Sequence, residues 1–148
     1  MAVKIADNKE HSNLTIDNMG VKATIYKLSI DGQISYIGCT QRELEKRANE
    51  HITQLQSCKH KNIKLSKRYA YSSEGVIEVE PVLQLPSDNK FLMYFCEGLV
   101  NSYYGSILVN DVVIAEGKGR IKLPRLDGGL AKKLLEVIAN WYNVPLNL

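Results

Sequence analysis

Residues 23–38, with the sequence ATIYKLSIDGQISYIG, decide the fold. β-Branched and aromatic residues are frequent on both sides of Asp31-Gly32, and such residues are typical of strands. An Asp-Gly pair between two strand-like runs favours a tight turn, because both residues tolerate the backbone conformations that the turn needs. The segment therefore predicts a β-hairpin.

The length of the turn determines which side chains share a face of the sheet. A two-residue loop at Asp31-Gly32 would place Tyr26 and Tyr36 on opposite faces. A three-residue loop over residues 30–32, with Gly32 in the left-handed conformation of a bulged turn, would place Tyr26 directly across from Tyr36. We expect the three-residue loop, and therefore both phenol rings on one face.

The hairpin is followed by a predicted helix over residues 42–56. Its apolar residues recur at helical spacing, at Leu44, Ala48, Ile52 and Leu55. Thr40 and Glu43 have the spacing of a capping box, so we expect Thr40 to cap this helix. Arg47 and His51 are four residues apart and therefore lie on one flank of it.

A third strand and a second long helix are predicted next. Residues 76–85 are typical of a strand bent at Pro81, and residues 89–103 form a helix that Ser87-Asp88 would cap. We expect the buried stripe of this helix to be Phe91, Phe95, Leu99 and Tyr103. Glu97 lies about 200° around the helix from Phe95 and Leu99, so its carboxylate is either solvated or directed at a site.

The C-terminal stretch has a pattern of its own. Residues 112–115 and 120–123 predict a short hairpin, and residues 130–142 predict an amphipathic helix. Its expected apolar side consists of Leu130, Leu134, Val137, Ile138 and Trp141. We expect this helix to pack on the main domain.

Together these elements predict an α+β fold, with a small three-stranded antiparallel sheet flanked by helices and a C-terminal basic hairpin and amphipathic helix. Residues 1–20 would form a polar N-terminal arm. Residues 21–110 would form the main domain, and residues 111–148 an extension that packs on it or contacts DNA or a partner.

Composition narrows the class of protein. A chain of 148 residues that is 45% hydrophobic and 24% charged is typical of one soluble globular domain. No apolar run approaches the ~20 residues that span a membrane, and residues 1–20 lack the apolar core of a secretory signal. The three cysteines, Cys39, Cys58 and Cys96, form no CxxC pair, which favours reduced thiols in the cytoplasm over a zinc site or a disulfide framework.

Two basic clusters are compatible with nucleic acid, as is a net charge of +3. Between Glu50 and Glu74 there is no acidic residue, and the cations there are Lys59, Lys61, Lys64, Lys67 and Arg68. The second cluster is Lys118, Arg120, Lys122 and Arg125. Each cluster would track a phosphate backbone or belong to a solvated loop.

Several of these residues stand in the order and spacing of a known nuclease motif. Ile25-Tyr26 and Tyr36-Ile37-Gly38 are followed by Arg47 and His51 on the next helix. Glu97 lies on the next long helix, and Asn110 comes after it. On these residues, residues 24–110 resemble the GIY-YIG nucleases. Thr24 stands where the first glycine of that motif usually is.

The resemblance implies roles for the matched residues. Glu97 would hold a single Mg²⁺, for which Mn²⁺ could substitute, and Arg47 would contact the non-bridging phosphate oxygens. Tyr26 would accept or relay the proton of the attacking water and Tyr36 would orient it. His51 is the other candidate base. Arg47, Lys27 or a metal-bound water would supply the positive charge that a tyrosine base needs.

The implied function is a Mg²⁺-dependent endonuclease that cuts double-stranded DNA and leaves a 5′-phosphate and a 3′-hydroxyl. His60, near Ile63-Lys64-Leu65, is similar to a histidine-then-helix segment of phage homing enzymes in this family. The DNA contacts would come from His60, Asn110 and the two basic clusters. A phage or restriction-type enzyme is expected, acting as a monomer or as a homodimer; the alternative is an inactive nucleic-acid-binding module on the same fold.

Overall fold

The computed structural model describes residues 3–5, 20–105, 114–116, 119–121 and 126–148. In the three-residue strands 3–5, 114–116 and 119–121 only the backbone is described. The elements are β1 (Val3–Ile5), β2 (Ala23–Ile30), β3 (Gln33–Thr40), α1 (Leu44–Gln56), α2 (Ile63–Ala70), β4 (Ile77–Leu85), α3 (Lys90–Tyr104), β5 (Ile114–Glu116), β6 (Gly119–Ile121) and α4 (Gly128–Tyr142).

The main sheet has the strand order β1-β4-β2-β3. β2 runs antiparallel to both β3 and β4, which confirms the three-stranded antiparallel sheet of an α+β fold. β1 adds a strand that the sequence did not predict, because it pairs parallel to β4 from within the expected polar arm. Three residues are too few for a strand pattern to be recognised.

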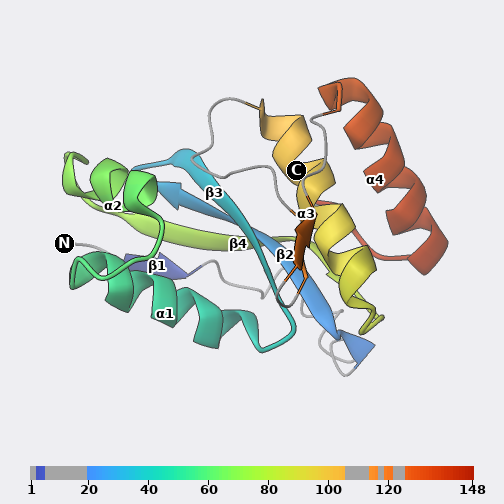
Figure 1. The fold of residues 1–148 in the computed structure, drawn as a ribbon, viewed down its shortest axis with the longest axis horizontal. Coiled ribbons are helices and arrows are strands. Elements are labelled where there is room, and N and C mark those ends of the chain that lie inside the picture. Colours follow the sequence, from blue (N-terminus) through green and yellow to red (C-terminus); the bar gives the residue numbers. More distant parts are fainter. Residues whose placement is uncertain (1–2, 6–19, 106–113, 117–118, 122–125) are drawn as a thin grey trace.

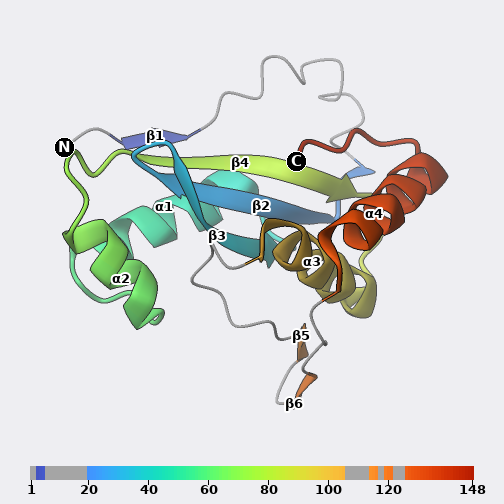
Figure 2. The ribbon, with the colours of Figure 1, turned by 90° about the horizontal axis from the view of Figure 1, so that it is seen from above.

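β2 is buried along its whole length because helices cover both faces of the sheet (Figures 1 and 2). Tyr26, Leu28 and Ile30 pack with residues of α1 and α2. Ala23 and Ile25, which alternate with them along the strand, pack with α3 and α4. Burying each of these aliphatic side chains stabilises the fold by roughly 1.5–3 kcal/mol. The two cores hold α1 and α3 against opposite faces.

The hairpin turn differs from the predicted one. Ile30 pairs with Gln33, so the loop has two residues, and positive φ angles at Asp31 (51°) and Gly32 (78°) make it a type I′ turn. The prediction of a three-residue loop is wrong, and so is the prediction of Tyr26 directly across from Tyr36, because Tyr26 pairs with Gly38. Nevertheless, a bulge shifts the register between Leu28 and Ser29, so that Leu28 pairs with Tyr36. Tyr26 shares the face of Leu28, which confirms that both tyrosines lie on one face.

Strand β4 contains a second irregularity. Ile25 pairs with Leu83 but Tyr26 pairs with Pro81, so Val82 is the extra residue of a bulge. Proline lacks the N–H that a regular ladder needs, and a bulge accommodates it. The predicted bend at Pro81 therefore has its cause in the strand register.

Both long helices begin later than predicted. Glu43 is the N-cap of α1, while Thr40 remains the last residue of β3 and its Oγ1 accepts a hydrogen bond from Arg42 N–H at 3.0 Å. Asn89 caps α3, and its Oδ1 accepts from Leu92 N–H at 3.1 Å. The predictions of Thr40 and of Ser87-Asp88 as caps were wrong.

The predicted buried stripe of α3 is also wrong. Phe91 is 54% exposed, Phe95 and Tyr103 are half-buried, and only Leu99 is fully buried. Met93 and Asn101, which share the helical face of Glu97, are buried instead. α3 packs on the sheet on one side and on α4 on another, so its buried arc is much wider than a single stripe. The face of Glu97 is therefore turned toward the protein.

The C-terminal stretch forms the predicted hairpin and helix. β5 and β6 pair antiparallel. Asp127 Oδ2 caps α4 by accepting hydrogen bonds from Gly129 and Leu130 N–H. α4 packs beside α3 (Figure 1).

The side of α4 that packs is not the predicted one. Its buried residues are Ala131, Leu135 and Ala139, whereas Val137 and Trp141 are exposed. Two alanines let the helices approach closely, which a stripe of large side chains would prevent. Within the described residues, no helix is both long and apolar enough to cross a membrane.

The turn of the hairpin is tied to the segment before β4. The Asp31 carboxylate accepts hydrogen bonds from Val76 N–H at 2.8 Å, Glu74 N–H at 3.0 Å and Ser73 Oγ at 3.4 Å. The two backbone N–H groups are the main reason why the pKa of Asp31 is lowered. The carboxylate thus stabilises the fold in its charged form.

We predict that Asp31→Asn destabilises the fold at neutral pH but not in acid. Asn tolerates the positive φ, yet it loses the charge. Because the folded pKa is depressed, the contribution of Asp31 is present above its unfolded pKa of about 3.9 and disappears as the pH falls through the folded pKa. Urea denaturation of both proteins at pH 7 and at successively lower pH measures this, and a loss of stability that does not shrink as the pH falls would contradict it.

Candidate active site

Tyr26 occupies the centre of the site, on the face of β2 that α1 covers. Its side chain is only 1% exposed and its ring lies against Gly38 of β3, the residue with which it pairs. A Cβ atom at position 38 would overlap the phenol, including its hydroxyl. Glycine is therefore required here, because any side chain would displace the Tyr26 hydroxyl.

A chain of hydrogen bonds leads from Tyr26 to the backbone before α2. Tyr26 Oη lies 2.7 Å from His51 Nε2, and His51 Nδ1 lies 2.7 Å from His60 Nε2. Asn62 N–H donates to His60 Nδ1 at 3.0 Å. The two imidazole rings are nearly parallel, with an angle of 18° between their planes. These hydrogen bonds join β2, α1 and the loop before α2 to one another.

The backbone N–H at the end of this chain determines where the protons are. His60 Nδ1 accepts, so a neutral His60 carries its proton on Nε2 and donates it to His51 Nδ1. A neutral His51 must then carry its proton on Nε2 and donate it to Tyr26 Oη. The Tyr26 proton is consequently directed away from both histidines.

Arg47 and Tyr36 complete this cluster. The Arg47 guanidinium also donates a hydrogen bond to the Tyr26 hydroxyl. Glu50 positions Arg47 with a 3.4 Å contact and forms a second ion pair with Arg42. The ring of Tyr36 meets that of His51 edge to face, with centroids 5.3 Å apart. Arg47, Tyr36 and His60 are half-buried, so the cluster is open to solvent on one side.

The environment keeps both central groups uncharged. Burial, and to a smaller extent the proximity of Tyr36, raises the pKa of the Tyr26 phenol, and Arg47 opposes this rise. Burial and the positive charge of Arg47 lower the pKa of His51 to about 3. His51 is therefore a weak base, and both of its nitrogens are already hydrogen-bonded. This disfavours His51 as the base and is consistent with Tyr26 as a protonated relay rather than a free base.

Glu97 approaches the cluster from the other helical layer. It lies on α3 beside Cys39, whose thiol donates a hydrogen bond to its carboxylate. Burial raises the pKa of Cys39, the charge of Glu97 raises it further and Arg47 lowers it. Cys39 faces α3 while its neighbour Gly38 faces Tyr26, because side chains alternate along β3. Glu97 and the tyrosines thus meet across this edge strand.

The structure brings together most of the predicted catalytic residues. Tyr26, Tyr36, Arg47 and His51 form one cluster, and Glu97 adjoins it through Cys39. The sequence analysis missed Cys39 and the N–H of Asn62. Because side chains alternate along β3, the sequence could have placed Cys39 on the face of the sheet that Tyr26 does not occupy. The backbone N–H of Asn62 has no signal in the sequence.

Two expectations change in detail. His60, expected to contact DNA, is hydrogen-bonded to His51 inside the cluster. Lys27, expected as a source of positive charge for Tyr26, faces the opposite side of β2 and its Nζ donates to the Asn147 carbonyl at 3.4 Å. Adjacent strand residues point to opposite faces, so the prediction for Lys27 was wrong.

The first basic cluster flanks His60 in the sequence and continues along α2. Lys59, Lys61, Lys64 and Lys67 are exposed, and Arg68 is half-buried. Of the second cluster, Lys118, Lys122 and Arg125 lie outside the described residues, as does Asn110, and Arg120 is described only by its backbone in β6. For these positions the expectation of DNA contact stays a prediction.

A Mg²⁺ ion would fit the donors present at Glu97. Within the part of the chain that the structure describes, no three His, Cys, Asp or Glu side chains gather as a metal site. Mg²⁺ commonly binds through one or two carboxylates, with water and substrate phosphates as its other ligands. The half-buried carboxylate of Glu97 could serve as such a ligand, although it would not enclose a permanently bound ion.

Comparisons with protein-family models, with curated proteins and with solved structures each yield no match to this chain. Function is therefore inferred from the residues and their geometry.

We predict that Gly38→Ala destabilises the protein by about 1–3 kcal/mol, the usual cost of forcing an extra methyl into a packed site. Gly20→Ala is the matched control, because a Cβ atom there would meet nothing within 4 Å. Urea denaturation at neutral pH measures both variants. Equal stability of the two would show that the phenol does not need the space above Gly38.

We further predict that His51 stays neutral in weak acid. Its folded pKa is about 3, against 6.5 when unfolded, so the unfolded state gains a proton first. Its contribution to stability is therefore complete above about pH 6.5 and is lost as the pH falls toward 3, at up to about 1.4 kcal/mol per pH unit. Imidazole NMR shifts across this range test it, and a His51 midpoint near 6.5 would refute it.

Proposed function

We propose that this protein is a Mg²⁺-dependent DNA endonuclease of the GIY-YIG type. One observation carries the proposal: the Tyr26 hydroxyl accepts hydrogen bonds from His51 and Arg47, while its own proton is directed away from both histidines. A phenol that merely packs in a core needs one partner. Two donors, one of them charged, partly offset the burial that keeps the phenol protonated, and they would stabilise the oxygen while it relays a proton from water.

The remaining groups supply what phosphodiester hydrolysis needs. Arg47 is permanently charged and half-buried, so its planar donors would bind the phosphate oxygens on which charge develops. His51 and His60 hold the Tyr26 oxygen in place and fix its proton direction. Tyr36, at the open side, would orient the attacking water. Mg²⁺, when bound by Glu97, would add positive charge near the leaving oxygen.

The exposed lysines that flank His60 and continue along α2 support a polyanionic substrate. Lys59 and Lys61 follow α1, and Lys64 and Lys67 continue along α2. Such contacts position a nucleic acid without reading its sequence, and they make binding strongly dependent on salt. We propose double-stranded DNA as the substrate, a 5′-phosphate and a 3′-hydroxyl as the product ends, and the cytoplasm of a bacterial or phage-infected cell as the location. A homodimer would supply the second active site for a double-strand cut.

A nucleic-acid-binding module without catalysis is the second candidate. The observation that favours it is the position of Cys39, which lies between Glu97 and the tyrosine cluster and hydrogen-bonds the carboxylate. If Glu97 stays engaged with this thiol, the carboxylate is not available to a metal ion. Binding of DNA would then persist while cleavage was lost.

We predict that the wild-type protein nicks supercoiled plasmid in the presence of Mg²⁺ and that Arg47→Ala and Glu97→Gln each slow nicking by at least about 100-fold. Each variant removes one source of charge stabilisation from the site. Gel electrophoresis of the plasmid measures the rates.

Two matched controls lie outside the cluster. Arg42→Ala removes a neighbouring cation that contacts Glu50 but not Tyr26, and Glu136→Gln neutralises an exposed carboxylate of α4. Both should cut at the wild-type rate. DNA binding without cutting by the wild-type protein, with Mg²⁺ or Mn²⁺, would instead support the binding module.

A further inference from the structure

The outer face of α2 combines cations with exposed apolar side chains. Ile63, Lys64, Lys67 and Tyr71 recur at helical spacing on this face, while Leu65 and Tyr69 anchor the opposite face in the core. Ile63 is 69% exposed and Tyr71 is 88% exposed. Lysines alone would suit a phosphate backbone, and the exposed ring of Tyr71 adds a flat surface on which a nucleic-acid base can stack.

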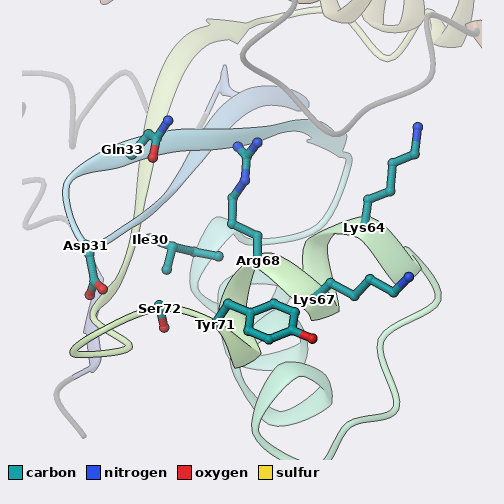
Figure 3. Close-up of a pocket in the computed structure, with 8 residues that line it drawn as sticks. All are labelled: Ile30, Asp31, Gln33, Lys64, Lys67, Arg68, Tyr71 and Ser72. Atoms are coloured by element: carbon teal, nitrogen blue, oxygen red, sulfur yellow. The ribbon is translucent and has the colours of Figure 1, made fainter.

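Tyr71 lines a surface hollow between α2 and the β2–β3 turn (Figure 3). The hollow has a volume of about 590 Å³, and its lining residues are Ile30, Asp31, Gln33, Lys64, Lys67, Arg68, Tyr71 and Ser72. The ring of Tyr71 lies next to the side chain of Lys67, and Arg68 extends from α2 toward β3 (Figure 3). A flat apolar surface and cationic groups are thereby offered to one ligand.

The base of the hollow is held in place by the backbone. Tyr71 N–H donates to the Lys67 carbonyl at 3.0 Å, and Ser72 N–H donates to the Tyr69 carbonyl at 3.1 Å. The turn on the other side is held by the Asp31 carboxylate, which is bound to Glu74 and Val76 N–H. Both walls are therefore preorganised, which reduces the entropy lost on binding.

We propose that this hollow binds an unpaired nucleotide of the DNA substrate, with its base stacked on Tyr71 and its phosphate paired with Lys67 or Lys64. In a duplex the base faces are stacked on one another, so an aromatic side chain beside the backbone gains nothing from them. In a single strand each base has a free face, and stacking on an aromatic ring contributes to binding for every base type. The substrate class is thus DNA with a single-stranded segment beside the cut.

The hollow lies within reach of the cluster around Tyr26. Gln33 is at its rim, and Tyr36 is three residues further along β3, a distance of about 10 Å at the rise of a strand. That equals about three base steps of a DNA strand. A short strand held on α2 would therefore pass the proposed catalytic residues. This inference rests on the proposed nuclease function and adds the form of its substrate.

Binding measurements in the Glu97→Gln background test the proposal without cleavage. The probes are a labelled duplex and the same duplex with a 12-nucleotide single-stranded tail. Fluorescence anisotropy measures their binding over a range of salt concentrations. We expect Tyr71→Ala to weaken binding of the tailed DNA by about 5- to 150-fold and to leave the plain duplex unchanged. Tyr71→Phe, which keeps the ring, should retain wild-type affinity.

The salt dependence separates stacking from charge. Tyr71→Ala should leave the slope of log K against log salt unchanged, because no counterion is released by a neutral ring. Lys67→Ala should reduce that slope by about 0.7–0.9, and Lys132→Ala, an exposed lysine of α4, should not alter it. Because Tyr71 is exposed, its replacement by Ala should leave the fold intact, which circular dichroism checks.

Each outcome decides one question. The stacking site is refuted if Tyr71→Ala weakens binding of the tailed and the plain duplex equally, or if it weakens binding of neither. This holds whatever the wild-type protein cuts. If the tailed DNA binds through Tyr71 but the wild-type protein cleaves no DNA, the hollow stands as a single-strand site and the nuclease function fails. If no DNA binds at all, both proposals fail.

Discussion

A buried hydroxyl needs hydrogen-bond partners, and the arrangement of the candidate site follows from how Tyr26 obtains them. Its ring is enclosed between β2, β3 and α1. The partners come from Arg47 and His51, one turn apart on α1, and His51 is in turn held by His60. One side chain thereby determines the position of a helix and of the loop that follows it.

The edge strand β3 connects the two halves of the site. Alternate residues of this strand face different helical layers, so Tyr36 and Gly38 lie with Tyr26 while Cys39 lies with Glu97. Glu97 on α3 and Arg47 on α1 therefore lie in different helical layers. The separation keeps the carboxylate from neutralising Arg47, whose charged partner in the described structure is Glu50 instead.

Patterns of short range were sufficient to predict much of this arrangement. The hairpin, the pairing of Arg47 with His51 on one helical flank and the placement of both tyrosines on one face are confirmed. The last was reached through the wrong turn, because a bulge compensated for a loop one residue shorter than expected. Because the bulge adds the one residue that the shorter loop lacks, the side chains of the strand still alternate onto the predicted faces.

Features that depend on three-dimensional contacts were not predictable. The buried sides of α3 and α4 were assigned from the largest apolar residues, yet α3 is covered on more than one side and α4 packs through Ala131 and Ala139. The role of Asn62 in fixing the histidine tautomers comes from a backbone N–H, which every residue except proline has. Sequence patterns are built from side-chain types, whereas helix packing and the hydrogen bond from Asn62 depend on where the backbone lies.

The uncharged histidine pair has a consequence for the electrostatic field of the site. With His51 neutral until the pH approaches 3 and the pKa of His60 also lowered by burial, the permanent positive charge within the described hydrogen-bonded cluster is that of Arg47. A guanidinium does not lose its proton under physiological conditions. The potential that an incoming anion meets there is consequently constant when the surrounding medium acidifies, in contrast to sites whose cation is an imidazolium.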